Sequence, residues 1–331
     1  MGMHQLSSPA DFSVYDDWIK SHPEGSLWQS LEWKKYQEAL GRETRLYVEK
    51  EESQIVASAL AIIDRTALGL STWDIPRGPL VVENEKWKVE NLVAHIISEA
   101  KKDKCVSMFL SPSFELSTFN FPLSTSPRHE QPEATRIIDL TKPEEEILAQ
   151  MKPKGRYNMS VAEKHGVTVQ RSEDVEGFFN LVKGTGERDR FSHLPLSHYQ
   201  AFLKELPQSF LLLAYHPNPN PNPNPIAGLI GVAWNKVAIY YYGASSYADR
   251  SLMAPYLLQW EAIRYCKASG CLTYDLLGVA PAVSDADHPW RGISAFKEKF
   301  GGSLVEYPPE KKIVLRKVAG WLLRVKRKLF G

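Results

Sequence analysis

Side chains that could bind a metal or act as a nucleophile are poorly grouped in this sequence. Asp285, Asp287 and His288 fall within four residues, and carboxylate and imidazole groups are common metal ligands. Three ligands this close along the chain do not readily surround one ion, and Pro289 fixes the backbone beside them, so a solvated loop is the favoured interpretation. The sequence holds no GxSxG, GxxxxGK[ST], GxGxxG or HExxH motif. We therefore expect neither a metal nor a cofactor.

The cysteine count and the hydropathy of the chain indicate a cellular compartment. Cys105, Cys266 and Cys271 are odd in number and form no CxxC pair, which fits a reducing cytoplasm better than a disulfide framework or a zinc site. No apolar run reaches about 18 residues, and the first eight residues lack the basic-then-apolar pattern of a signal peptide. We expect a cytoplasmic protein.

The segment from Arg250 to Pro255 has the position of a phosphate-binding turn but not its composition. In acyl-CoA-dependent N-acyltransferases the turn reads Arg/Gln-x-x-Gly-x-Gly/Ala, because bare amides at a helix start must approach the CoA pyrophosphate. Here Met253 and Pro255 fill the two small positions, and proline has no N–H to donate. An acyltransferase of this kind should use another acyl donor. Taken alone, the segment is better explained as a loop before a helix in an unrelated fold.

The elements that must position this turn occur twice along the chain. The pattern predicts two strands, a helix and a further strand in each half, and Gly78–Gly243 and Cys105–Cys271 lie 165 and 166 positions apart. The first copy comprises strands at 54–63 and 70–82 and a helix at 89–105, and the second comprises strands at 226–234 and 236–245 and a helix at 254–271. The mixed pattern predicts two similar α/β domains with helices packed on central sheets.

The Pro-, Ser- and charge-rich stretch 123–135 is the expected boundary, which gives a first domain over 1–134 and a second over 135–309. A strand should follow, and Thr141 with Glu144 predicts a capping box that opens a helix ending before Pro153. The Asn-Pro repeat at 216–225 is interpreted as a stiff loop that joins two strands of a hairpin.

The net charge of +1 conceals a strongly basic C-terminus. Residues 311–331 hold eight basic residues and no acid, so residues 1–310 carry a net charge of −7. From Lys317 onward, apolar residues recur at helical spacing, with basic residues around them. Such a helix can lie on an anionic membrane surface or bind phosphates. Alternatively, a helix over 310–331 docks on the first domain and completes it.

Several segments together resemble the Fem family of peptidoglycan-bridge aminoacyltransferases. In chain order they are WQSLEWKKYQEALG (28–41), IPRGPLVV (75–82), the stretch from TRIIDLT to HGVTV (135–169), YYYGASS (240–246), APYLLQWEAI (254–263), YDLLG (274–278) and HPWRGISAFKEKFGG (288–302). The resemblance implies tandem acyltransferase domains of the GNAT fold, with mixed central sheets. The helical-hairpin arm that some members insert in the second domain has no room here, because only about 70 residues separate Val167 from Val237.

What the resemblance implies is transfer of an aminoacyl group from aminoacyl-tRNA to an amine in the stem peptide of a peptidoglycan precursor, at the inner face of the membrane. The precursor is either lipid II or its soluble form, UDP-MurNAc-pentapeptide, and the basic tail modestly favours the lipid-linked form. Two other functions stay open: an acyl-CoA-dependent N-acyltransferase of the same fold, and a non-catalytic module that binds a membrane surface or RNA.

Aminolysis of an ester passes through an oxyanion, which needs a cation or N–H donors. The match of SAFKEKFGG to the family's Phe-Lys motif makes Lys297 the candidate cation, with Phe296 beside the acceptor or the terminal adenosine. From spacing alone, Lys297 would be a solvated helix lysine. Asp275 and Glu261 are candidate bases that could equally be structural, and the substrate itself is the third candidate for carrying the proton.

In the first domain, the resemblance assigns the precursor phosphates to cations. The motif WKKY offers Trp33 and Lys35, with Lys34 adjacent, and Arg77 in IPRGP is a second candidate. Solvated surface lysines remain the alternative.

In the second domain, Lys152, Lys154 and Arg156 form a candidate tRNA-binding patch, with Tyr157 available to stack. Tyr242 and Tyr256 are candidates for binding the peptide. On regular strand alternation, Tyr240 and Tyr242 share one face of their strand and Tyr241 takes the other.

Overall fold

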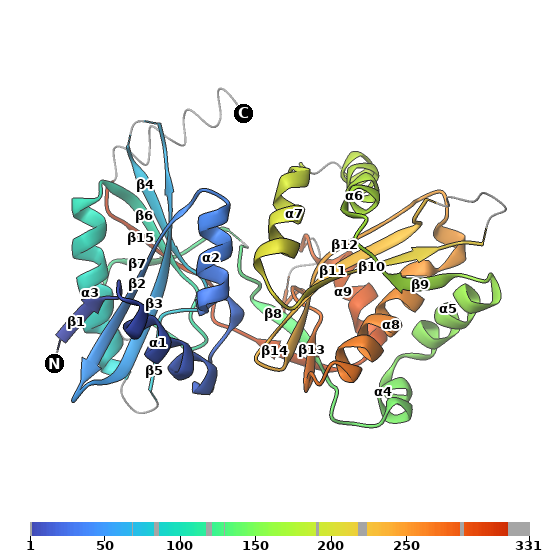
Figure 1. Cartoon of the computed structure of the whole chain (residues 1–331), viewed down its shortest axis with the longest axis horizontal. Helices are drawn as coiled ribbons and strands as arrows, with labels where there is room; N and C mark the ends of the chain where they lie inside the picture. The colour runs from blue at the N-terminus through green and yellow to red at the C-terminus, as the bar shows by residue number, and fades with distance from the viewer. Residues whose placement is uncertain are drawn as a thin grey trace. The chain divides into compact units, whose positions relative to one another are not determined.

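The chain folds as two α/β units that repeat one arrangement of strands and helix (Figure 1). The computed structural model describes residues 2–67, 69–82, 86–116, 121–128, 130–189, 192–217, 224–284 and 288–316. Unit 1 is formed by the chain up to Glu133 and again from Tyr307, and unit 2 is formed by Ala134–Glu306.

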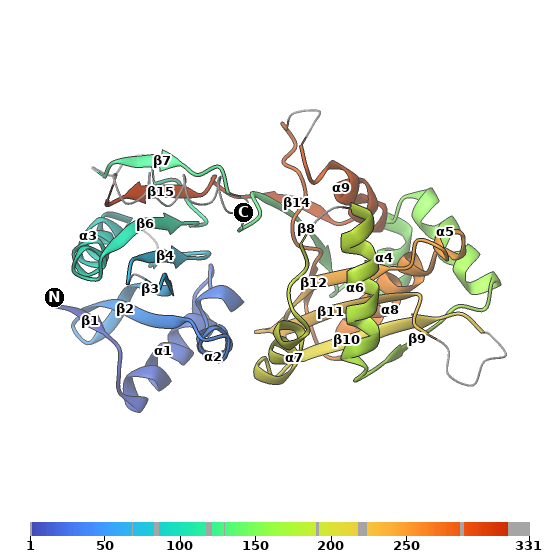
Figure 2. The same ribbon diagram turned by 90° about the horizontal axis from the view of Figure 1, so that it is seen from above.

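Unit 1 is built on a mixed sheet with the main order β1-β2-β3-β4-β6-β15-β7, and β5 pairs with β3 beside this path. Its elements are β1 (Gly2–Gln5), α1 (Pro9–Ser21), η1 (Leu27–Gln29), α2 (Leu31–Ala39), β2 (Glu43–Glu51), β3 (Gln54–Arg65), β4 (Ser71–Ile75), β5 (Leu80–Val81), α3 (Lys86–Lys102), β6 (Cys105–Leu110), β7 (Leu123–Thr125) and β15 (Lys311–Val314). Figure 2 shows α3 on one face of this sheet and α1 and α2 on the other.

Unit 2 is built on a mixed sheet with the order β14-β8-β13-β12-β11-β10-β9. Its elements are β8 (Ala134–Asp139), α4 (Glu144–Gln150), α5 (Pro153–Lys164), β9 (Thr168–Arg171), α6 (Val175–Asp189), α7 (Leu196–Glu205), β10 (Ser209–Tyr215), β11 (Ala227–Trp234), β12 (Val237–Ser245), η2 (Arg250–Leu252), α8 (Ala254–Ala268), β13 (Thr273–Asp275), α9 (Arg291–Lys297), η3 (Glu298–Phe300) and β14 (Ser303–Glu306). Helices α8 and α5 cover one face, and α6 and α7 cover the other (Figure 2).

The predicted duplication is confirmed by strand pairing. In unit 1, β3 and β4 are antiparallel, and β4 is parallel to β6 after the crossover through α3. In unit 2, β11 and β12 are antiparallel, and β12 is parallel to β13 after the crossover through α8. Each crossover helix buries an apolar stripe on its sheet, because apolar residues recur at helical spacing in both.

The segment that completes unit 1 is a strand where a helix over 310–331 was expected. Strand β15 pairs antiparallel with β6 on one side and with β7 on the other, and Ile313 is buried between them. Its backbone therefore gains two ladders of hydrogen bonds, which outweigh helix propensity in so short a segment. The basic tail from Lys317 onward lies outside the described residues.

The start of the second unit corrects one local prediction. The backbone N–H and the hydroxyl of Thr141 both donate to Asp139 Oδ1, at 2.9 and 2.6 Å, so Thr141 closes a turn and does not cap α4. The helix starts after Pro143. Its end at Gln150, before Pro153, agrees with the sequence, and the same proline opens α5.

The Asn-Pro loop joins β10 and β11, which form the antiparallel hairpin expected around it, although residues 218–223 are outside the described part.

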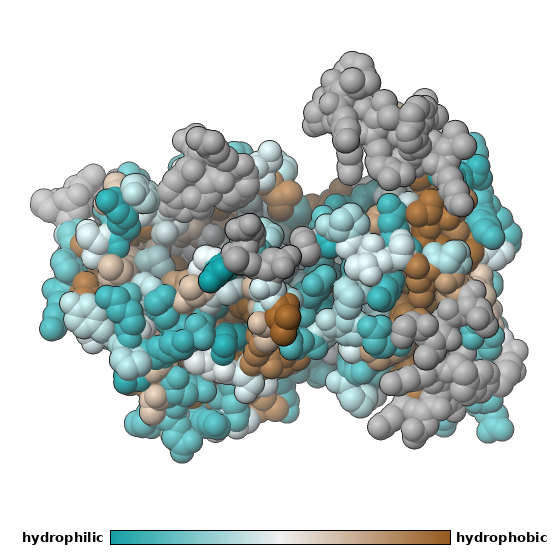
Figure 3. All heavy atoms as spheres, turned by 180° about the vertical axis from the view of Figure 1, so that it is seen from behind, coloured by the Kyte–Doolittle hydropathy of each residue, from teal (hydrophilic) through white to brown (hydrophobic). Residues whose placement is uncertain are grey.

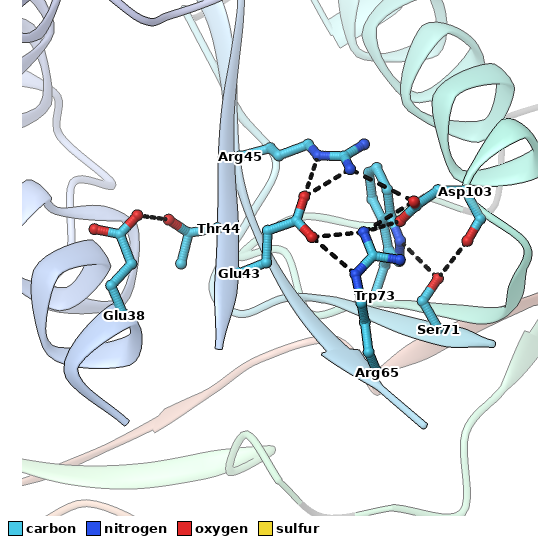
Figure 4. Close-up of polar contacts among 8 residues, drawn as sticks. All are labelled: Glu38, Glu43, Thr44, Arg45, Arg65, Ser71, Trp73 and Asp103. Atoms are coloured by element: carbon cyan, nitrogen blue, oxygen red, sulfur yellow. Dashed lines mark hydrogen bonds and ion pairs between the residues drawn. The ribbon is translucent and has the colours of Figure 1, made fainter. Parts of the chain in front are cut away.

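One charged network ties β2, β3 and β4 to the turn after α3 in unit 1 (Figure 4). Arg65 Nε lies 2.9 Å from Glu43 Oε2, and its Nη2 lies 2.9 Å from Asp103 Oδ1. Arg45 Nε lies 2.8 Å from Glu43 Oε1, and its guanidinium covers the buried ring of Trp73. Two arginines and two carboxylates balance, so this network is structural and leaves no net charge for a ligand.

Figure 3 shows the hydropathy of one face of the molecule. Polar side chains cover most of the face seen in Figure 3, with separate apolar patches between them. Among the residues that the structure describes, every helix is too short or too polar to cross a bilayer.

Candidate functional site

Lys297 is a buried cation of unit 2. It ends α9, and only 7% of its surface is exposed, so the alternative of a solvated helix lysine is wrong. Its Nζ donates to the carbonyl oxygens of Gly278 at 2.8 Å and Leu277 at 3.2 Å, and it lies 5.6 Å from the centre of the Tyr240 ring. Lys299, which follows two residues later in η3, instead donates to the Ala295 carbonyl of α9.

The two carbonyls that hold Lys297 belong to a strained turn after β13. Leu277 has a left-handed backbone with φ of +56°, which a branched side chain rarely adopts. Asp275 Oδ1 accepts the Leu277 N–H at 2.6 Å and also the hydroxyl of the buried Thr135. Asp275 therefore fixes the turn that aims both carbonyls at the ammonium.

The ammonium of Lys297 has a lowered pKa. Burial lowers the pKa of its ammonium to about 8, although the negative charge of Asp275 acts in the opposite direction. Within the described part of the chain, no carboxylate lies within ion-pair distance of Lys297 Nζ. A cation with no ion-pair partner can stabilise negative charge that develops on a substrate.

A cavity of about 300 Å³ lies beside this lysine. Its walls come from the ends of β11 and β12, the loop after β12, the first turns of α8 and one face of α9. Tyr240, Tyr256 and Phe296 line it, and the rings of Tyr256 and Phe296 pack edge to face with centroids 5.2 Å apart. The cavity therefore extends to Phe296, which directly precedes Lys297 in the chain, and to Tyr240, whose ring lies near the Lys297 ammonium.

The turn before α8 offers few donors to a diphosphate. The Met253 N–H is bonded to the Arg250 carbonyl, and the Tyr256 N–H is bonded to the Met253 carbonyl. Pro255 has no N–H, and Met253 adopts a left-handed backbone with φ of +54°. This geometry supports the inference that the acyl donor is not a CoA thioester.

The three consecutive tyrosines of β12 are arranged differently from the prediction. The ladder with β11 slips by one residue, with Ile230 opposite Tyr242 and Gly231 opposite Tyr240, so Tyr241 is the extra residue of a bulge. Tyr240 consequently packs on the α8 side, whereas Tyr241 and Tyr242 both contact Phe202 of α7. The prediction that Tyr240 and Tyr242 share one face is wrong, because the bulge breaks the alternation.

Tyr242 lies in an aromatic cluster on that second face. Its hydroxyl is 3.0 Å from His198 Nε2, and its ring contacts Tyr199. The structure thus separates Tyr242 from the cavity that Tyr256 lines.

The candidate residues of unit 1 lie in two settings. In α2, Trp33 is buried against Trp28 and Tyr36, whereas Lys35 is exposed. Lys34 forms an ion pair with Glu38 at 2.6 Å.

Arg77 is 93% buried, and its guanidinium is held by protein groups. It donates to the Pro132 carbonyl at 2.8 Å and lies 3.7 Å from the centre of the Tyr307 ring. These two residues are at the places where the chain leaves unit 1 and returns to it. The arrangement indicates that Arg77 ties both crossings together.

The basic residues at the start of α5 also divide. Lys152 forms an ion pair with Glu298 at 2.7 Å, and Arg156 donates to the carbonyls of Ala149 and Met151. Lys154 lies over the ring of Tyr157, which is 62% exposed. Lys154 and Tyr157 are therefore the better placed pair for a nucleic acid.

Glu261, the other candidate base, is bonded to Arg264 on the same helix at 3.1 Å. Asp285 and Asp287 are outside the described residues, and the described ones contain no cluster of metal-binding side chains.

Two residues near Lys297 were not singled out from the sequence. Thr135 bonds Asp275, and Gln259 is a 98% buried amide on the apolar side of α8. A signal for Gln259 was present, because a polar residue interrupts the apolar run APYLLQWEAI where burial is expected.

Comparisons with known proteins agree with the family resemblance of the sequence segments. The sequence model of the FemAB family matches residues 12–131, 122–218 and 215–325. The chain is 23% identical over 376 residues to lipid II:glycine glycyltransferase of Staphylococcus haemolyticus, with 88% of each protein covered, and 23% identical over 374 residues to the Staphylococcus aureus protein of the same name, with 88% and 89% covered.

Among solved structures, the fold matches that of FemX with a TM-score of 0.81 at 20% identity, over 98% of this chain and all of the other. It also matches a tandem GNAT protein from the clavulanic acid biosynthesis pathway with a TM-score of 0.57 at 12% identity, over 95% and 98%. The expected pair of GNAT-like units is confirmed.

Proposed function

The chain belongs to the FemAB family of peptidoglycan-bridge transferases, and on that premise we propose that it moves an aminoacyl group from aminoacyl-tRNA to an amine in the stem peptide of lipid II. The observation that carries the chemistry is Lys297, a buried cation with no ion-pair partner among the described residues, beside a cavity large enough for a small substrate group. Two relatives named lipid II:glycine glycyltransferases support the lipid-linked acceptor over the nucleotide-linked one.

In this mechanism, Lys297 stabilises the oxyanion of the tetrahedral intermediate. The ester carbonyl enters the cavity, the acceptor amine attacks it, and negative charge develops where the ammonium lies. Asp275 acts through the Leu277 turn and not as a base, because both hydrogen bonds at its Oδ1 hold the site together. Glu261 is committed to Arg264, so it is not the base either.

The donor is assigned to tRNA because the turn before α8 disfavours CoA. Unit 2 carries the chemistry, and Lys154 with Tyr157 is the contact for the RNA. Unit 1 binds the precursor, with Lys35 at its phosphates. Arg77 keeps a structural role in this arrangement, since its guanidinium is already bonded.

The activity is tested by mixing the protein with charged tRNAs and either lipid II or UDP-MurNAc-pentapeptide, followed by mass analysis of the precursor. The expected product is lipid II enlarged by one or more aminoacyl residues, with acetyl-CoA inactive as a donor. Product formed only with acetyl-CoA would replace the proposal with an ordinary N-acetyltransferase.

We also propose peripheral binding at the inner membrane face through the basic tail. Deletion of 317–331 is expected to weaken association with vesicles that contain anionic lipid, and added salt should abolish the difference. Vesicle binding that is independent of salt, or of the tail, would contradict this.

A further inference from the structure

Three polar side chains lie next to one another at one wall of the cavity, where Tyr240 and Gln259 line it and Tyr274 bonds Gln259. Tyr274 Oη donates to Gln259 Oε1 at 2.8 Å, and the Gln259 side chain also bonds the hydroxyl of Tyr240. Tyr274 is fully buried, and Gln259 is 2% exposed.

The phenol of Tyr240 keeps its proton at neutral pH. Burial raises the pKa of Tyr240 to about 12, and the hydrogen bond with Gln259 only partly opposes this. The hydroxyl therefore stays protonated and has one hydrogen to give.

The cavity is where that hydrogen is usable. Tyr240 lines it, and so does Gly243. A Cβ at Gly243 would lie 1.8 Å from Tyr240 Oη, so only glycine at that position leaves room for the hydroxyl. Lys297 Nζ is held on the same ring. A substrate group in the cavity thus meets the phenol of Tyr240, and the ammonium of Lys297 lies 5.6 Å from the centre of that ring.

We propose that the hydroxyl of Tyr240 is a second catalytic group, which protonates the oxygen that leaves when the tetrahedral intermediate collapses. This inference rests on the proposed transfer from an aminoacyl ester, and it divides the work of the site. Lys297 stabilises the negative charge on the carbonyl oxygen, and Tyr240 protonates the ribose oxygen of the tRNA as it leaves.

The step balances in atoms and charge. The nitrogen lone pair of the acceptor forms the new C–N bond, and the carbonyl π electrons move to oxygen. When the carbonyl re-forms, the bond from carbon to the ribose oxygen breaks and that oxygen takes the proton from Tyr240. The new amide nitrogen, which still carries an excess proton, returns one to the phenolate. Tyr240 ends as it began, so no other reactant is consumed.

The test compares two aminoacyl donors whose leaving oxygens differ in how strongly their departure depends on protonation. One is a short charged RNA with its natural terminal ribose, and the other carries fluorine at the terminal 2′ position, which makes the adjacent 3′ oxygen a better leaving group. With the natural donor, Tyr240→Phe should lower the single-turnover rate on the order of 100-fold. With the fluorinated donor, the loss should shrink to a few-fold. Tyr241→Phe, on the opposite face of β12, is the matched control and should keep the wild-type rate.

The outcomes separate this inference from the function beneath it. If the wild type transfers nothing from either donor, the proposed function fails. If the wild type is active and Tyr240→Phe matches it, Tyr240 is not catalytic. An equal loss with both donors shows that the hydroxyl only supports the structure, which also overturns the inference.

Discussion

Both units place one cation beside the end of their parallel strand pair, but they treat its charge in opposite ways. In unit 1, Arg128 lies over Phe109 of β6 and bonds Asp74 at 2.7 Å and Glu310 at 2.9 Å. Burial alone would lower its pKa, but the bonds with Glu310 and Asp74 raise it above its usual value. In unit 2, the described partners of Lys297 are two carbonyls and a ring face, and burial lowers its pKa.

The difference indicates how a duplicated fold separates stability from chemistry. A cation that is paired with two carboxylates holds the segments that carry them together. Because its charge is neutralised, it attracts negative charge on a substrate only weakly. A cation held by neutral groups is costly to bury, and its charge remains available. On the proposed function, this contrast fits a binding role for unit 1 and the reaction in unit 2.

The largest expected effect comes from removing the cation of unit 2. Lys297→Met keeps the bulk of the side chain but removes the charge, so the rate constant of transfer should fall by about 100- to 1,000-fold. The free energy of unfolding should drop by no more than about 1 kcal/mol, because a desolvated ammonium is lost with its bonds. Single-turnover kinetics and urea denaturation measure the two quantities. A rate close to wild type would end the role of Lys297.

Removing the cation of unit 1 should have the reverse outcome. Arg128→Met leaves Asp74 and the buried Glu310 without their partner, so the free energy of unfolding should fall by about 3 kcal/mol. Transfer per folded molecule should stay at the wild-type level. A stable variant with impaired transfer would show that the contrast between the units is mistaken.

The charge of Asp275 can be removed with little change in shape. Asp275→Asn keeps an acceptor for Leu277 and Thr135, but it deletes the charge that raises the pKa of Lys297. The pKa of Lys297 should then fall below about 8, so its ammonium loses its proton at lower pH. The alkaline limb of the pH–rate profile should shift to lower pH, with a loss of about tenfold near pH 8. An unshifted limb with the same loss would indicate a purely structural role.

The smallest effect is expected at the surface of unit 1. Lys35→Ala should raise the KM for lipid II by about threefold to tenfold and leave kcat near the wild-type value, if Lys35 only binds phosphate. Lys34→Ala is the matched control, since Lys34 is paired with Glu38. A change confined to kcat would move Lys35 out of the binding role.

The sequence predicted the repeated strands and the crossover helices because their apolar periodicity is long and regular. It failed where tertiary contacts decide. The bulge at Tyr241 depends on pairing with β11, and β15 depends on two partner strands distant in sequence. The burial of Lys297 was not predictable, because α9 has only seven residues and the turn at Leu277 that receives the lysine is 20 positions away. The burial of Arg77, the second candidate for the precursor phosphates, was likewise not predictable from its neighbours in sequence.

The return of the chain to unit 1 has a consequence for biosynthesis. Strand β15 is made after the whole of unit 2, and until it arrives β6 presents an unpaired edge and β7 has no neighbour in the sheet. All of unit 2 is therefore synthesised before the sheet of unit 1 can be completed. Nascent chains arrested before residue 311 would carry an incomplete sheet in unit 1. Holdase chaperones would bind its unpaired edge.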